Sequence, residues 1–262
     1  MRKRSENRPT PCGPCGETDM HRILARLSGL ALALALAHTA PAQALDLIKI
    51  TLPDGTDSRY VVALPPDFDA NKSYPTLIAI PGGEQTPEGA LSMVGRFEDE
   101  ANARGIIVIG ISTDYNGVRP MFGPYADDTL IPQLMAEMLA RYPVEGGAFY
   151  VTGHSAGGES AFRAAIRHPE MFRSITSTSS YVADEDLPNV GVLKDIPVNL
   201  MVGGDDFAYH PGATQSRDAL LAAGVDLYFE IRGTDKHSMI SLRTPEGMAF
   251  FFDLVTRTGP VN

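Results

Sequence analysis

The stretch VTGHSAGGES, residues 151–160, places a single serine between glycines at a spacing suited to nucleophilic chemistry. Ser155 directly follows an apolar, β-branched run and directly precedes a helix-forming segment, which is the context that the Gly-x-Ser-x-Gly pattern requires. A sharp turn there lifts the hydroxyl clear of a sheet, and Gly153 and Gly157 leave room for neighbouring backbone. The alternative is a plain strand–helix turn with an incidental serine. The order of the elements favours a nucleophile.

A serine hydroxyl is a weak nucleophile at neutral pH, so it needs a general base that is oriented by a carboxylate. His237, in the loop after the apolar run 226–233, is the predicted base by elimination. The other histidines are set aside for different reasons. His21 and His38 lie in the N-terminal leader, and His168 lies at a helix end. His154 adjoins the serine, but its side chain is expected to point away into the turn. His210 remains the alternative base, although it follows closely after Asp206.

The orienting carboxylate is expected after the run 198–204, because the usual chain order in this arrangement is serine, acid, histidine. Asp205 and Asp206 both stand there. The spacing from the strand end favours Asp206, with Asp205 as the alternative and otherwise a solvated loop residue.

The negative oxygen that develops during acyl transfer needs two preorganised N–H donors. The N–H of Ala156, at the start of the helix after the serine, is one candidate. The loop PGGEQTP after the run 76–80 offers the second. We assign it to Gly83, with Glu84 as the next choice and a plain turn as the alternative reading of the loop.

The elements that must position these groups alternate between buried strands and helices. Strands are predicted at 76–80, 106–112, 148–153, 173–179, 198–204 and 226–233, and helices at 88–105, 129–143, 156–169, 213–224 and 244–257. A leading hairpin, 45–65, turns at Asp54-Gly55. This alternation predicts an α/β fold with a mainly parallel sheet covered by helices on both faces and an antiparallel hairpin at one edge. Ligands of such sheets bind beyond the carboxyl ends of the strands.

The composition, with 44% hydrophobic residues, is sufficient for a buried core, and residues 45–262 are expected to form one domain. Residues 1–44 are expected to be a leader. From Met20 onward they show the basic start, short apolar middle and small-x-small end of a secretory signal peptide, so Met20 is the expected true start. Both cysteines of the chain, Cys12 and Cys15, form a Cys-Gly-Pro-Cys motif in this leader, where a redox role lacks its usual strand and helix.

The net charge is −10, and the leader carries more basic than acidic residues, so residues 45–262 are more negative still. A field of this sign repels nucleic-acid phosphates and anionic lipid, and we expect neither partner. The acidic clusters Asp127-Asp128 and Asp184-Glu185-Asp186 could hold calcium but are more typical of a solvated surface. No metal or cofactor is predicted, and the oligomeric state stays open.

The segments YVVALPPDFDANKSYPTLIAIPGGEQ, VTGHSAGGESAFRAAIRHPEMF, GGDD and DKHS together resemble the α/β-hydrolase superfamily. They are most similar to its secreted esterase branch, which includes polyhydroxybutyrate depolymerase-like, feruloyl and acetylxylan esterases. The resemblance implies a Ser155–His237–Asp206 triad, an acyl-enzyme intermediate and no cofactor. Pro81-Gly82 replaces the usual His-Gly before the oxyanion loop, which leaves the second donor less defined.

Lid domains in this superfamily are usually inserted where this chain has only the short segment 180–197, so no large lid is expected. The predicted cleft is open and suits a bulky or polymeric ester, with residues 112–128 as one wall and Tyr115, Phe122, Tyr125 or Tyr181 as aromatic wall residues. We therefore expect an exported serine hydrolase acting on carboxylic esters. The alternatives are acyl transfer or peptide hydrolysis by the same residues, and a catalytically inactive binding protein, against which the complete serine, acid and histidine set argues.

Overall fold

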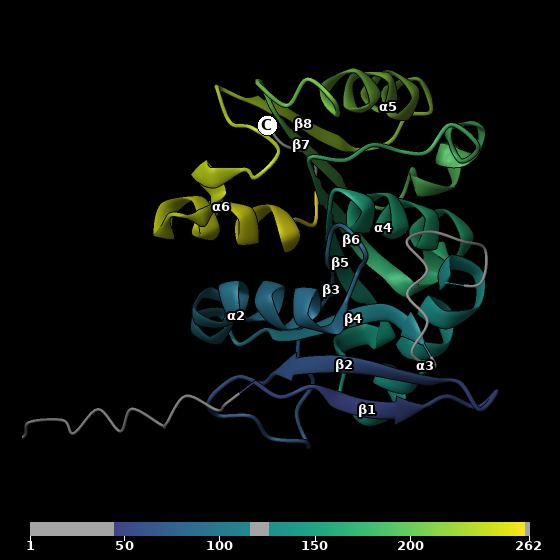
Figure 1. The fold of residues 1–262 in the computed structure, drawn as a ribbon, viewed down its shortest axis with the longest axis vertical. Helices are drawn as coiled ribbons and strands as arrows, with labels where there is room; N and C mark the ends of the chain where they lie inside the picture. Colours follow the sequence, from purple (N-terminus) through teal and green to yellow (C-terminus); the bar gives the residue numbers. More distant parts are fainter. Residues whose placement is uncertain (1–44, 116–125, 260–262) are drawn as a thin grey trace, which may run out of the picture. The chain divides into compact units, whose positions relative to one another are not determined.

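An eight-stranded β-sheet forms the centre of the computed structural model, which describes residues 45–115 and 126–259 (Figure 1). These residues all belong to one contact unit, Gln43–Asn262, and the predicted leader lies outside the described residues. No helix in the described part of the chain is both long enough and apolar enough to cross a bilayer.

The strand order along the sheet is β1-β2-β4-β3-β5-β6-β7-β8. The strands are β1 (Ile48–Thr51), β2 (Asp57–Ala63), β3 (Thr76–Ile80), β4 (Ile107–Tyr115), β5 (Phe149–His154), β6 (Phe172–Thr178), β7 (Val198–Gly203) and β8 (Leu227–Arg232). β1 and β2 form an antiparallel hairpin, and β2 pairs antiparallel with β4. The pairs from β4 through β3 to β8 are all parallel. The predicted mainly parallel sheet with an antiparallel edge hairpin is confirmed.

Helices cover both faces of the sheet, with α2 and α6 on one side and α3, α4 and α5 on the other (Figure 1). Their bounds are α2 (Pro87–Arg104), α3 (Ile131–Arg141), α4 (Ala156–Arg167), α5 (His210–Ala222) and α6 (Pro245–Val255). Successive side chains of β3 enter two different cores, because side chains alternate along a strand. Leu77 and Ala79 pack with α2 and α6, whereas Ile78 and Ile80 pack with α3 and α4. This two-sided burial explains why the strand sequences are continuously apolar.

The helix boundaries follow from capping residues. Thr86 precedes α2, and its hydroxyl accepts a hydrogen bond from the Gly89 N–H at 3.1 Å. Gly105 ends the helix in the left-handed conformation at a φ of 66°, as the sequence predicted. α5 begins at His210 rather than at 213, because Pro211 suits the first turn of a helix. β4 continues past the predicted end at 112 to Tyr115, where it still pairs with β2.

The connection from β6 to β7 is short, as predicted, and contains only a 3₁₀ segment, Leu187–Leu193. No lid domain is inserted at this point of the described chain. The second predicted insertion, 112–128, falls largely outside the described residues, and Phe122 and Tyr125 with it.

Candidate active site

Ser155 occupies a strained turn between β5 and α4. Its φ of 55° and ψ of −128° lie in a region that residues with a Cβ rarely adopt. The turn is tight enough to exclude side chains at the flanking glycines. A Cβ at Gly153 would lie 2.1 Å from the Gly157 carbonyl oxygen, and one at Gly157 would lie 2.2 Å from the Ile80 oxygen. Glycine is therefore required at both positions because neighbouring backbone passes too close for a side chain, as the sequence pattern predicted. The serine lies at the carboxyl edge of the sheet.

His237 and Asp206 are brought together by the loops after β8 and β7. The Nδ1 atom of His237 lies 2.9 Å from the Oδ2 atom of Asp206, whose side chain is buried. The two loops touch closely, since a Cβ at Gly203 would lie 2.2 Å from the Asp235 oxygen. Asp205 instead uses its backbone N–H to bond the Asp235 carbonyl oxygen at 3.0 Å, and within the described structure no hydrogen bond joins its carboxylate to His237. Of the two predicted acids, Asp206 is the one that contacts the imidazole.

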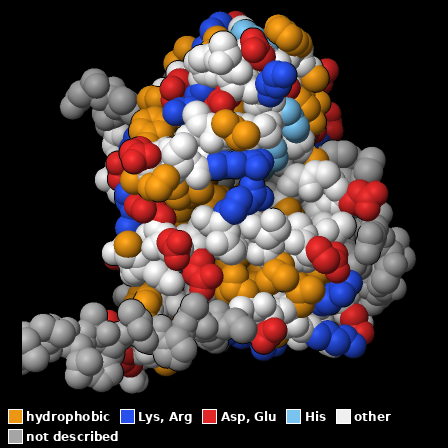
Figure 2. Space-filling model, turned by 60° about the vertical axis from the view of Figure 1, so that its left-hand side comes forward, with side chains coloured by type: hydrophobic (Ala, Val, Ile, Leu, Met, Phe, Trp, Pro, Cys, Tyr) orange, Lys and Arg blue, Asp and Glu red, His pale blue; other side chains and the backbone are white. Residues whose placement is uncertain are grey.

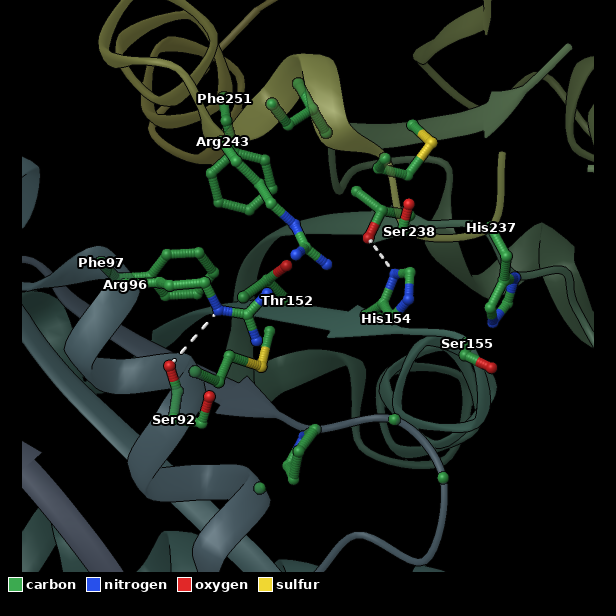
Figure 3. Close-up of a pocket in the computed structure, with 18 of the residues that line it drawn as sticks. Ser92, Arg96, Phe97, Thr152, His154, Ser155, His237, Ser238, Arg243 and Phe251 are labelled. Carbon is green, nitrogen blue, oxygen red and sulfur yellow. Dashed lines mark hydrogen bonds between the residues drawn. The ribbon is translucent and has the colours of Figure 1, made fainter. Parts of the chain in front are cut away.

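The alternative base, His210, begins α5 and is not among the residues that line the pocket beside Ser155. His237 lies in that pocket together with Ser155, and Figure 3 shows its ring next to the serine. The serine hydroxyl, however, donates its hydrogen bond to the phenol oxygen of Tyr209 at 3.0 Å. Among the described residues, no hydrogen bond joins Ser155 to His237.

Tyr209 was not anticipated from the sequence. The centroid of its ring lies 4.4 Å from that of His237 and 5.6 Å from that of Tyr181, and both pairs of rings are tilted. His237 is also flanked by His154, at a ring separation of 4.9 Å. The imidazole thus has a hydrogen-bond partner at one nitrogen and two neighbouring aromatic rings. The only available signal was that Tyr209 follows Asp206 by three residues, in the turn that leads into α5.

The predicted oxyanion donors lie on two segments that converge on the serine. Ala156 opens α4, and the first N–H groups of a helix have no acceptor within it. The loop after β3 passes beside the serine, since a Cβ at Gly82 would lie 3.2 Å from the Ser155 Cβ. Gly83 lines the same pocket with a φ of 65°. The buried amide of Gln85 fixes this loop to α4 by donating to the Ser160 hydroxyl at 2.8 Å.

The prediction that His154 points away into the turn is wrong. His154 ends β5 and lines the pocket, and its Nδ1 atom lies 3.1 Å from the Thr178 hydroxyl. Strand alternation explains this direction, because Tyr150 and Thr152, at the same parity in β5, also face the side of α2 and α6. Burial lowers the pKa of His154 to about 4, and the positive charges of His237, Arg96 and Arg243 act in the same direction. His154 is therefore neutral at pH 7.

This depressed pKa predicts a loss of stability in acid. The unfolded chain protonates His154 as the pH falls below its ordinary pKa near 6.5, whereas the folded protein does so only near pH 4. Stability contributed by the neutral form is thus fully present above pH 6.5 and is lost as the pH falls toward 4, by up to about 3 kcal/mol. Chemical denaturation of the parent and of His154→Gln at pH 7 and pH 4.5 should show the smaller pH dependence in the variant.

The matched control is His168→Gln, because His168 lies at the end of α4 and outside the pocket. This variant should keep the pH dependence of the parent. Equal pH dependence in the parent and in His154→Gln would contradict the assignment of His154 as a buried neutral group.

A pocket of about 430 Å³ extends from Ser155 between α2 and α6. Its walls are mostly apolar and include Met93, Leu242 and the rings of Phe97 and Phe251, which stack at 5.3 Å. Two charged side chains, Arg96 and Arg243, reach into it from opposite sides (Figure 3). The pocket is thus an apolar cavity with a nucleophile at one end and cationic groups at the other.

The predicted acidic clusters make ion pairs where they are described. Glu185 and Asp186 both bind Arg163, and Asp128 binds Arg167. Within residues 45–115 and 126–259, no three His, Cys, Asp or Glu side chains group in a way that could hold a metal ion. Of the predicted aromatic wall residues, Tyr181 packs against Tyr209, while the side chain of Tyr115 is outside the described part.

Comparison with known proteins assigns the chain to a family. A family model described as "Putative esterase" matches residues 54–203. A search of curated proteins found none that matches the chain.

Solved structures share the fold at low sequence identity. A CE1 ferulic acid esterase from the anaerobic fungus Anaeromyces mucronatus matches with a TM-score of 0.65 and 16% identity, over 84% of this chain and 92% of that one. A fluorophosphonate-binding serine hydrolase from Staphylococcus aureus matches with a TM-score of 0.63 and 18% identity, over 82% and 99%. A thermostable esterase matches with a TM-score of 0.62 and 17% identity. The match covers 80% of this chain but only 62% of that longer esterase.

Proposed function

Because the chain belongs to the esterase family of carboxylic ester hydrolases, we propose that Ser155, His237 and Asp206 are its catalytic triad. The observation that carries this proposal is the 2.9 Å hydrogen bond between His237 and Asp206 beside the strained serine. A buried carboxylate at Nδ1 holds the proton on that nitrogen and leaves Nε2 free to accept one. It also stabilises the imidazolium that forms after proton transfer.

The proposed reaction has two halves. The Ser155 hydroxyl rotates from Tyr209 toward His237, transfers its proton to Nε2 and attacks the ester carbonyl carbon. The tetrahedral intermediate then expels the alcohol, which takes the proton from His237, and an acyl-enzyme remains. Water attacks the acyl group with His237 again as base, and the carboxylic acid leaves as Ser155 regains its proton.

The N–H groups of Ala156 and Gly83 are the proposed oxyanion donors. Support comes from the start of α4, whose first N–H groups and positive dipole end adjoin the serine. The Gln85–Ser160 hydrogen bond supports a preorganised loop on the opposite side. Donors fixed before the reaction stabilise the developing charge without reorganisation, which is the main source of their effect.

The proposed substrates are bulky esters. We also propose that the protein is exported, as expected from the signal-peptide pattern of residues 20–44. Two observations support a bulky substrate. The β6–β7 connection is short, and the fungal protein of the same fold is named a ferulic acid esterase. A polymeric ester, which the open cleft was expected to admit, is the extreme of this class.

Covalent labelling tests the proposal. A fluorophosphonate reacts with a serine only when a base and an oxyanion site activate it, so the folded protein should gain one label. Peptide mapping should locate the label on Ser155 and not on Ser238, which is exposed in the same pocket. Absence of label on folded protein, or a label on another residue, would contradict the assignment.

A further inference from the structure

Arg96 and Arg243 form a paired cationic site in the pocket. Arg96 comes from α2 and Arg243 from the 3₁₀ segment Ile240–Arg243, and Figure 3 shows their guanidinium groups directed toward one another beside Thr152. The Nε atom of Arg96 donates to the Ser92 carbonyl oxygen at 3.3 Å. In the described part of the chain, neither guanidinium makes an ion pair with a carboxylate.

This arrangement is unusual for a chain with 32 acidic and 22 basic side chains. Most other arginines in the described part of the chain are matched with acids: Arg104 binds Asp253, and Arg257 binds Asp226 at 2.7 Å. Figure 2 shows basic side chains adjoining histidines on this face, with acidic side chains farther away. Two like charges thus lie together here without a carboxylate partner in the described part of the chain, although both side chains are exposed to solvent.

The local environment strengthens the repulsion. Although much of Arg96 is exposed, its guanidinium is partly desolvated, and this burial together with the charge of Arg243 lowers its pKa. His154 lies between the arginines and Ser155 and is neutral at pH 7, so it adds no charge. Arg243 is also exposed, so water screens part of the repulsion, while apolar side chains such as Met93 and Phe251 line the pocket beside the pair.

We propose that this pair binds a carboxylate carried by the ester substrate, while Ser155 attacks the ester group at the other end of the pocket. The inference rests on the proposed function and names its substrate class. Two guanidinium groups offer planar forks of N–H donors that match a carboxylate, and such charge-assisted bonds are the strong ones. The apolar stretch lined by Met93, Phe97 and Phe251 would hold the hydrocarbon portion between the two ends.

The test compares charged and uncharged esters of the same shape. On the acyl side, p-nitrophenyl monoesters of glutaric, adipic and suberic acid are compared with esters in which an isopropyl group replaces the free carboxylate. On the alcohol side, the acetate ester of p-hydroxybenzoate is compared with that of p-isopropylphenol. The measured quantity is the ratio of kcat/KM for the charged ester to kcat/KM for its isostere.

We expect a ratio well above one for at least one of these pairs. The pair that shows it identifies whether the anion lies on the acyl or the alcohol side of the ester. Arg96→Gln and Arg243→Gln should each lower this ratio about tenfold, the equivalent of one charge-assisted hydrogen bond. Arg96→Lys and Arg243→Lys should restore part of it, because they keep the charge but lose the fork. The control is Arg141→Gln, whose exposed arginine pairs with Glu137 on α3 and should leave the ratio unchanged.

Ratios near one for every pair, or a preference that survives in the Arg96→Gln/Arg243→Gln double variant, would overturn the inference. If the protein is labelled at Ser155 and hydrolyses uncharged esters, such a result removes only the carboxylate site. If the folded protein neither takes the label nor turns over any ester, the proposed function fails and the inference fails with it.

Discussion

Replacing Ser155 by alanine is expected to lower kcat on p-nitrophenyl esters by about 10⁶-fold. Without the hydroxyl no acyl-enzyme can form, and His237 can assist only the direct attack of water. The remaining pocket and N–H donors still favour the tetrahedral intermediate, so a residual rate of roughly 10³–10⁴ over the uncatalysed reaction should persist. Initial rates at high enzyme concentration, with the parent protein diluted to match, measure the difference.

Alanine removes only an oxygen that is 3.0 Å from the Tyr209 hydroxyl, so the variant should remain folded. The substitution should leave most of the backbone strain in place, because alanine, like serine, would carry a Cβ at a positive φ. Far-UV circular dichroism and a denaturation midpoint close to the parent's are the control. A folded Ser155→Ala protein with kcat within a hundredfold of the parent would place the nucleophile elsewhere.

The fold was predictable because its signals are local and repeated. Runs such as TLIAI, bounded by Pro81 and a glycine pair, are buried on both faces of β3 and therefore lack any alternation in the sequence. The turn at Ser155 was predictable for a similar reason, since Gly153 and Gly157 are required by backbone contacts within one strand–helix unit and the adjoining strand.

The parts that were missed depend on contacts between distant segments. Arg96 sits among ordinary charged residues of α2, and only the packing of α2 beside α6 brings it to Arg243. Tyr209 likewise becomes part of the site because its ring meets His237 from another loop. The direction of His154 was available in the strand periodicity, but the sharp turn at Ser155 obscured which face the last strand residue would take.

Asp206→Asn is expected to lower kcat by about 10⁴-fold while leaving the pocket intact. Asparagine has nearly the shape of aspartate, so the effect is chemical. The amide carries no charge to stabilise the imidazolium, and if its N–H₂ group faces Nδ1 it forces the proton onto Nε2, where His237 can no longer accept one. The buried position of Asp206 makes this loss large, because water cannot replace the carboxylate at 2.9 Å.

Asp205→Asn is the matched control, since it makes the same chemical change at the adjacent residue. The Asp205 backbone N–H bonds Asp235 and is retained in the variant, and its carboxylate has no described contact with His237. We therefore expect kcat for Asp205→Asn to stay within a few-fold of the parent. Equal losses in the two variants would show that the effect comes from net charge or folding of the loop after β7. A larger loss at Asp205 would mean that the reacting enzyme uses a different arrangement of this loop from the one that pairs Asp206 with His237.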